Sequence, residues 1–227
     1  YPFSCSSVEF YRGPVLRSLS DNLSEYFEDA LIVTQKNGEK AGLIVAIGEA
    51  AKVANELKLD LSTLKKNTDL LMPAFFDTHF HWVQDDVRKM PKVSLIEWLE
   101  RYTFPEEAKY SDRKFSSNKA EQFWKRILSV GTIGGLCYSS IHEVALEEAF
   151  KHAPEDFYIG NVLMTMNCPE DIRQSPHKAC ASVDNCAKRY NSRYVCSPRF
   201  APTTCPEAMQ ASALAAARHD CFQQTHL

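Results

Sequence analysis

With 227 residues, 44% of them hydrophobic and 24% charged, the chain has the composition of a soluble globular protein that can bury a core of its own. Its formal net charge of −3 and the absence of a Lys- or Arg-rich run argue against nucleic acid as a partner. No apolar run approaches the length of a membrane span, so we expect no membrane association.

The cysteines and the first residues indicate a compartment. Eight cysteines are scattered along the chain without a C-x-x-C motif, which is typical of free thiols in a reducing environment. A disulfide between Cys180 and Cys186 remains an alternative. The first ten residues lack an initiator Met, a basic segment and an apolar segment, so we predict no signal peptide and a cytoplasmic location.

Residues 1–70 predict a small β-rich domain. The segment VEFYRGPVL is strand-like, and two β-branched runs flank Asn37-Gly38, which predicts a hairpin. The Ala/Leu/Lys-rich stretch 49–61 predicts a helix. Nothing in this part carries evident chemistry, so we expect it to be structural.

Residues 71–227 alternate between strands and helices, which predicts a parallel sheet built from β/α units. The apolar run that begins at Leu71 indicates a strand buried on both faces. Thr204-x-x-Glu207 resembles a capping box before the last helix, and Gly131 ends the longest one. The expected strands are 71–77, 132–140, 158–164, 194–200 and 221–226, and the expected helices are 94–102, 113–130, 144–151, 182–190 and 206–219.

About five β/α units in this length fit part of a closed barrel better than a complete one, because eight units take roughly 250 residues. An open doubly wound sheet is the alternative, but no Gly-rich phosphate turn is present. We therefore predict an α/β fold, an incomplete (β/α)8 TIM-type barrel of the metal-dependent hydrolase kind over residues 71–227. Its two outer strands should have unpaired edges.

Histidines at the expected strand ends predict a metal site. His79 and His81 are two residues apart in a strand, so their side chains point the same way and can bind one divalent ion. A pair of strand-end histidines donating to nearby carbonyl groups is the alternative. Arg199 and His226 follow two later strands, and in a barrel the carboxyl ends of all strands meet at one mouth.

Several segments resemble a known family. PAFFDTHFHW resembles the segment that opens the barrel in the amidohydrolase superfamily. WLERYTFP, SPRF and QTH resemble segments of the guanine deaminases within that superfamily, as do GTIGGLCYSSIH and VLMTMN. The resemblance covers about residues 71–227.

The resemblance implies roles for individual residues. His79, His81 and His226 correspond to zinc ligands, with one Zn²⁺ per subunit, and Gln84, Arg199 and Phe200 correspond to residues that hold guanine. An Arg fork matches the O6 and N7 atoms of guanine, and a Phe ring can stack on a flat base. The implied reaction is the hydrolytic deamination of guanine to xanthine and ammonia in purine catabolism, carried out by a homodimer.

The acid/base Glu of the family corresponds to a position beyond Leu227, as do a further His and an Asp. We therefore expect no catalytic residue within these 227 residues, and we expect the sequence to be a fragment that is inactive alone. Two other readings stay open. One is another aminohydrolase of the same fold, acting on a cytosine, pterin or triazine ring, and the other is a truncated, non-catalytic subunit.

Overall fold

The computed structural model describes residues 7–91 and 94–226. The chain forms two compact units, Tyr1–Pro73 and Ala74–Leu227. Each unit has its own hydrophobic clusters. Within the part that the structure describes, no helix is both long and apolar enough to cross a membrane.

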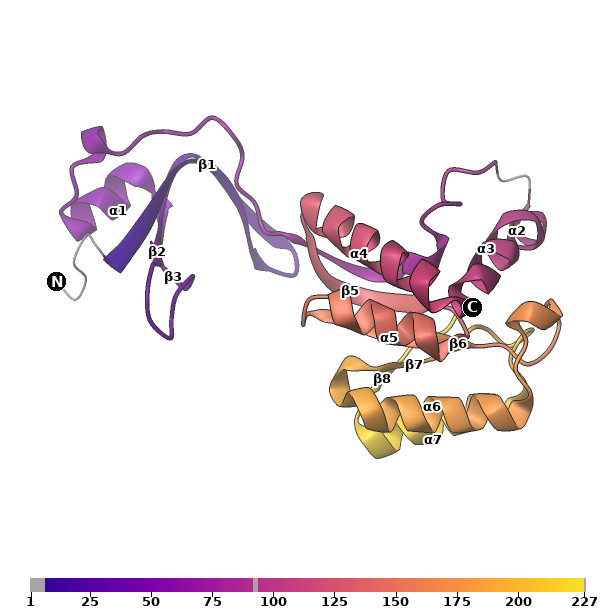
Figure 1. The fold of residues 1–227 in the computed structure, drawn as a ribbon. Coiled ribbons are helices and arrows are strands. Elements are labelled where there is room, and N and C mark those ends of the chain that lie inside the picture. Colours follow the sequence, from indigo (N-terminus) through magenta and orange to yellow (C-terminus); the bar gives the residue numbers. More distant parts are fainter. Residues whose placement is uncertain (1–6, 92–93, 227) are drawn as a thin grey trace. The chain divides into compact units, whose positions relative to one another are not determined.

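The first unit is a three-stranded antiparallel sheet with one helix (Figure 1). Its elements are β1 (Val8–Ser20), β2 (Leu23–Gln35), β3 (Ile44–Glu49) and α1 (Ala50–Leu57). The predicted hairpin is confirmed, because β2 pairs with β3. The helix is shorter than predicted, because Lys58 adopts a left-handed conformation (φ 55°) and its N–H caps the last turn.

The second unit is a parallel sheet with strand order β4-β5-β6-β7-β8. This is the partial barrel predicted from the sequence, and β4 and β8 are its two edges. The strands are β4 (Phe75–His81), β5 (Thr132–Ser139), β6 (Phe157–Leu163), β7 (Val195–Pro198) and β8 (Phe222–Gln223). The helices are α2 (Leu95–Trp98), α3 (Phe104–Ala108), α4 (Arg113–Ser129), α5 (Glu143–His152), α6 (Pro176–Tyr190) and α7 (Pro206–His219).

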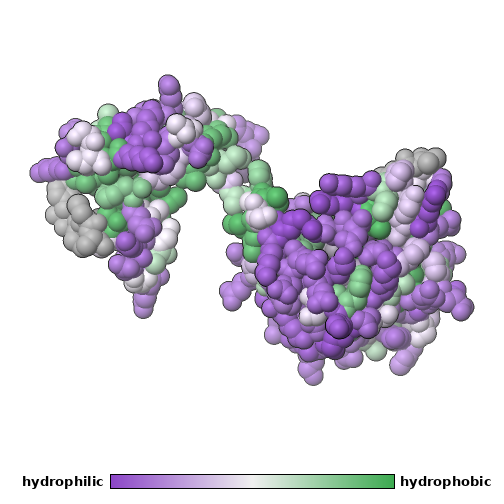
Figure 2. Space-filling view, turned by 45° about the horizontal axis from the view of Figure 1, so that its top comes forward, coloured by the Kyte–Doolittle hydropathy of each residue, from purple (hydrophilic) through white to green (hydrophobic). Residues whose placement is uncertain are grey.

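The main core of this unit lies between the strands and the helices α4 to α7, which lie on one side of the sheet in Figure 1. Trp82, Trp124 and Tyr110 are the largest fully buried side chains in it, and each is at most 2% exposed. The face shown in Figure 2 is mainly hydrophilic in this unit. The burial of one apolar face of each helix therefore fixes the strands whose ends carry the predicted site.

The first strand of the barrel differs from its prediction. It begins at Phe75, and Leu71 instead pairs with Val15 in the first unit. Phe75 and Phe76 are each 54% exposed, so the prediction of burial on both faces is wrong for this strand. The reason is that β4 lies at the edge of the sheet and pairs only with β5.

One capping motif and one helix start also differ from their predictions. The predicted capping box is wrong, because Cys205 is the N-cap of α7, without a side-chain cap, and the Thr204 hydroxyl donates to the carbonyl of Leu163 at 2.7 Å. Helix α6 begins at Pro176, six residues before its prediction, because the Ser175 hydroxyl caps it. Cys180 and Cys186 both lie on α6 as free thiols, so the alternative disulfide does not form.

The segment between β4 and α4 is less regular than the predicted helix 94–102. A four-residue α2 leads into a π-helical turn at Leu99–Thr103, and α3 follows directly. π-Helical turns occur frequently at functional sites, since the extra residue re-aims the side chains that follow. This segment contributes side chains to the pocket described below.

Candidate metal centre and ring pocket

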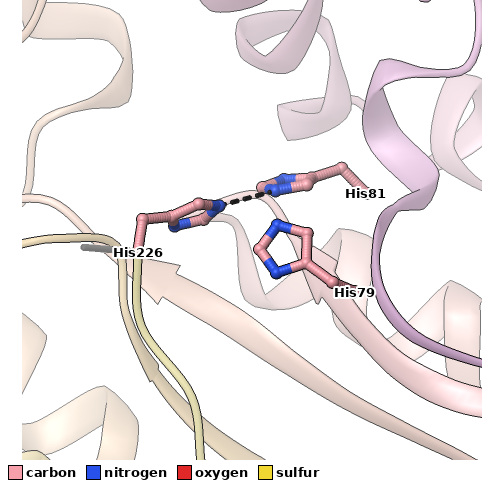
Figure 3. Close-up of side chains that lie close together, drawn as sticks. All are labelled: His79, His81 and His226. Atoms are coloured by element: carbon pink, nitrogen blue, oxygen red, sulfur yellow. Dashed lines mark hydrogen bonds between the residues drawn. The ribbon is translucent and has the colours of Figure 1, made fainter.

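Three histidines from the two edge strands meet at the carboxyl ends of the sheet. His79 and His81 come from β4, and His226 follows β8. Their three nearest ring nitrogens all lie within 4.8 Å of one another, and Figure 3 shows the rings converging. The Nε2 atoms of His81 and His226 are 3.0 Å apart. The spacing of the H-x-H motif therefore brings its two imidazoles together with a third that is 145 residues from His81.

Hydrogen bonds fix the orientation of two of these rings. The Nδ1 of His226 donates to the carbonyl of Arg199 at 2.7 Å, so its Nε2 carries a lone pair that faces the cluster. The Nδ1 of His81 lies 3.1 Å from the amide nitrogen of Gln84. The bond from His226 is the arrangement that orients metal-binding histidines in proteins, because the outer N–H of such a ring donates to an acceptor. The amide nitrogen of Gln84 is itself a donor, so Nδ1 of His81 accepts from it.

Burial keeps the imidazoles of His81 and His226 neutral. It lowers the pKa of His81 well below its usual value, with further lowering by the positive charge of Arg199 and by the two other histidines. Burial likewise lowers the pKa of His226, although its bond to the Arg199 carbonyl acts in the opposite direction. A neutral imidazole is the form that binds a metal ion, so the site favours ligation over protonation at neutral pH.

The donor set fits a zinc ion. A tetrahedral Zn²⁺ at its usual distance from nitrogen places its ligand atoms about 3.4 Å apart. The nitrogens of this cluster need only small movements to reach that spacing.

A buried tyrosine that sequence reasoning missed contacts all three histidines. The ring of Tyr138, on β5, stacks on His81 with centroids 4.5 Å apart and an interplanar angle of 9°. Its centroid is 5.0 Å from that of His79 and 4.6 Å from that of His226. Burial raises the pKa of its hydroxyl to about 12, so the group stays neutral. Tyr138 therefore packs against the cluster as an uncharged wall.

A second missed residue is Glu107 on α3, whose side chain is 1% exposed. One of its oxygens accepts from Gln84 Nε2 at 2.8 Å, and the other accepts from Arg199 Nη1 at 2.6 Å. Arg199 itself is buried, at 3% exposure, which excludes a surface ion pair. Nothing in the acidic segment Pro105–Ala108 distinguished this Glu from an ordinary solvated one.

A cavity of about 330 Å³, here called the ring pocket, joins these groups. Its volume lies in the range of small-molecule sites, and its walls are largely apolar with a few convergent polar groups. All six residues singled out from the sequence line it together with three apolar side chains: His79, His81, His226, Gln84, Arg199 and Phe200, with Leu95, Trp98 and Leu99.

A larger hollow of about 500 Å³ runs along the edge strand β4 and shares His81 and Gln84 with the first. Its other polar lining consists mainly of Asp85, Arg88 and Arg126, and Asp85 pairs with both arginines. The smaller cavity is therefore the better candidate for a ligand site, because only there do the histidine cluster, the arginine and the phenylalanine meet.

Comparisons with known proteins agree with this fold. Guanine deaminase of Escherichia coli is 29% identical over 210 residues, which cover 89% of this chain and 47% of that protein. Guanine deaminase of Dictyostelium discoideum is 25% identical over 243 residues, covering 97% and 53%. The chain thus spans about half the length of the curated relatives it matches. No family model matches it.

Solved structures give the same result. The E. coli guanine deaminase structure matches with a TM-score of 0.77 and 26% identity, over 97% of this chain and 53% of that one. A guanine deaminase from C. acetobutylicum, solved with guanine in its active site, matches with a TM-score of 0.79 at 20% identity, over 97% and 53%. A zinc-bound chlorohydrolase from Arthrobacter aurescens has a TM-score of 0.68 at 18% identity, over 96% and 52%.

The second unit therefore has the fold of the amidohydrolases, with its histidines at the carboxyl ends of the strands. Within that class, the chain is a homologue of the guanine deaminases.

Proposed function

We propose that this chain is part of a zinc-dependent guanine deaminase, which hydrolyses guanine to xanthine and ammonia. The observation that carries the proposal is the cavity in which a three-histidine cluster faces Arg199, Gln84 and Phe200. The similarity to guanine deaminases selects this reaction among those that the fold supports.

In the proposed reaction, His79, His81 and His226 hold one Zn²⁺ per subunit. When bound, such an ion lowers the pKa of its water to about 7 and so supplies hydroxide at neutral pH. His81 and His226 hold the site in the neutral, ligating form, because burial opposes the protonation of these two rings.

The ring of guanine is bound by the other side of the cavity. The guanidinium of Arg199 carries donors that match the O6 and N7 acceptors of the base. Phe200 offers an aromatic face to the flat ring, and Leu95 and Leu99 add apolar surface to the same cavity. These groups orient the carbon that bears the amine toward the histidine cluster.

Proton transfer to the leaving amine needs an acid/base group that these residues do not provide. The carboxylate of Glu107 is committed to Gln84 and Arg199. The family resemblance assigns the role to a Glu beyond Leu227. We therefore propose that residues 1–227 alone bind zinc and the ring but do not turn guanine over.

The test is to follow guanine conversion to xanthine, together with ammonia release, by the naturally produced protein loaded with Zn²⁺. We expect turnover that a chelator abolishes and Zn²⁺ restores, and no turnover of cytosine, which lacks the imidazole ring that carries N7. Turnover of cytosine in preference to guanine would contradict the proposal, and so would guanine turnover that survives complete removal of metal.

The homodimer implied by the resemblance and the cytoplasmic location indicated by the cysteines and the first residues remain predictions. Light scattering of the naturally produced protein would measure the first, and fractionation of its source cells the second.

A further inference from the structure

We propose that Glu107 is the positioning residue of the ring pocket: its carboxylate holds Arg199 and Gln84 in the orientation that recognises an oxopurine. This inference rests on the proposed function, since it concerns how the same cavity selects its ligand.

The first observation is that the two oxygens of Glu107 have different partners. Oε1 accepts from the amide of Gln84 at 2.8 Å, and Oε2 accepts from the guanidinium of Arg199 at 2.6 Å. Both partners line the cavity, whereas Glu107 is not among its lining residues. A single buried carboxylate that does not line the cavity therefore holds two side chains that do.

The second observation concerns the guanidinium. The bonds from Arg199 to side chains in the described ranges use one nitrogen, Nη1, which contacts Glu107 and, at 3.5 Å, the sulfur of Met164. The ring of Phe104 lies 5.4 Å from the guanidinium carbon. Phe104 and Glu107 are three residues apart on α3, so one short helix restrains the arginine through a ring and a carboxylate. The other N–H donors of the Arg199 guanidinium are available to bind a ligand.

The third observation is continuity with the metal centre. The same amide nitrogen of Gln84 that donates to Glu107 lies 3.1 Å from Nδ1 of His81. A chain of hydrogen bonds thus runs from Arg199 through Glu107 and Gln84 to a metal-binding histidine. Because networks of this kind hold their members in one arrangement, the ring pocket and the metal site share one support.

A purely stabilising ion pair does not account for this arrangement. Burying a charge pair costs desolvation that its attraction roughly repays, so such a pair is weak support for a fold. The adjacent residue Glu106 shows the ordinary alternative, because its carboxylate pairs with Lys109 one turn along the same helix. Glu106 is also buried, at 6% exposure, yet it does not line the cavity. It is therefore a matched control for any change made at Glu107.

The experiment uses the naturally produced protein loaded with Zn²⁺ and two probes that lack the 2-amino group of guanine. Hypoxanthine carries O6 and N7, and purine lacks O6. We expect the wild type to prefer hypoxanthine, and we expect Glu107→Gln to reduce that preference about tenfold, the equivalent of about 1.4 kcal/mol. Glu107→Asp keeps the charge but cannot reach both partners, so it should lose the preference as well. Glu106→Gln should keep it, and all three variants should retain zinc.

A double-variant cycle tests whether Glu107 acts through Arg199. If it does, Glu107→Gln has no further effect on the preference once Arg199→Gln is in place. Full additivity of the two changes would overturn the proposal, as would equal weakening of hypoxanthine and purine binding by Glu107→Gln or Glu107→Asp.

A readout without ligand separates this inference from the proposed function. Nuclear magnetic resonance of the Arg199 guanidinium protons should show slow exchange with water in the wild type and Glu106→Gln, and fast exchange in Glu107→Asp. Unchanged exchange in Glu107→Asp overturns the positioning role whatever the protein binds. Faster exchange in a protein whose wild type binds no oxopurine supports the positioning role and contradicts the guanine deaminase function.

Discussion

One ion pair in each unit of this chain shows how differently a charged pair can be placed. In the first unit, the pair Arg17–Glu25 bridges adjacent strands with 29% and 38% of its side chains exposed. In the second unit, the pair Arg199–Glu107 is 4% and 1% exposed and joins two segments 92 residues apart. Solvated pairs contribute little and cost little, whereas a buried pair is expensive to maintain. The second unit therefore bears the desolvation cost of a buried ion pair, and it does so beside the ring pocket.

The largest expected effect concerns metal binding. Replacing His79 or His226 with Ala should lower the affinity of the second unit for Zn²⁺ by at least about 100-fold, since one of three ligands is lost. His152, which lies at the end of α5, provides the control: His152→Ala should bind Zn²⁺ like the wild type. Calorimetric titration of the metal-free protein measures both. Equal affinity in all variants would show that the cluster is not the site.

Breaking the buried pair should come next. Arg199→Ala leaves the Glu107 carboxylate buried without its cation, so we expect the free energy of unfolding to fall by about 3–5 kcal/mol. The matched change in the first unit, Arg17→Ala, should cost only about 1 kcal/mol or less. All three tryptophans lie in the second unit, so their fluorescence during urea unfolding reports that unit, while circular dichroism follows both. Similar costs for the two changes would remove the contrast drawn above.

A smaller effect should separate the units by pH. The folded pKa values of His81 and His226 lie below the ordinary value of 6.5, so the contribution of these neutral histidines to stability is complete above that value. It is lost as the pH falls from 6.5 toward the folded pKa values, by at most about 1.4 kcal/mol per pH unit for each histidine. The metal-free second unit should therefore unfold at lower urea concentrations at pH 5.5 than at pH 7.5.

The first unit contains no histidine, and the Arg12 side chain lowers the pKa of its Asp29 below 3.8. That contribution persists at every pH above 3.8 and disappears only as the pH falls further. The unfolding of the first unit should thus be unchanged between pH 7.5 and 5.5. A shift of the same size in both units would contradict the assignment of the effect to the histidine cluster.

The sequence by itself determined the features that depend on local pattern. The period of apolar residues and the turn signals predicted the hairpin of the first unit and the alternating strands and helices of the second, because strand and helix periods are properties of short segments. The H-x-H spacing and the placement of Arg199 and His226 after strands predicted which side chains would share the mouth of the sheet. The unpaired edge of β4 was predicted, but the exposure of its two faces was missed, since an apolar run does not tell what packs on either face of a strand.

Only the tertiary structure decided what surrounds those side chains. Glu106 and Glu107 are adjacent and chemically identical, yet one pairs with a lysine on its own helix and the other reaches an arginine 92 residues away. Tyr138 likewise differs from other strand residues only because three histidines from two other segments pack on its ring. Contacts between distant segments depend on how the strands and helices pack, which no local pattern contains. For that reason the side chains that meet at the mouth of the sheet could be predicted from the sequence, while the residues that hold them in place could not.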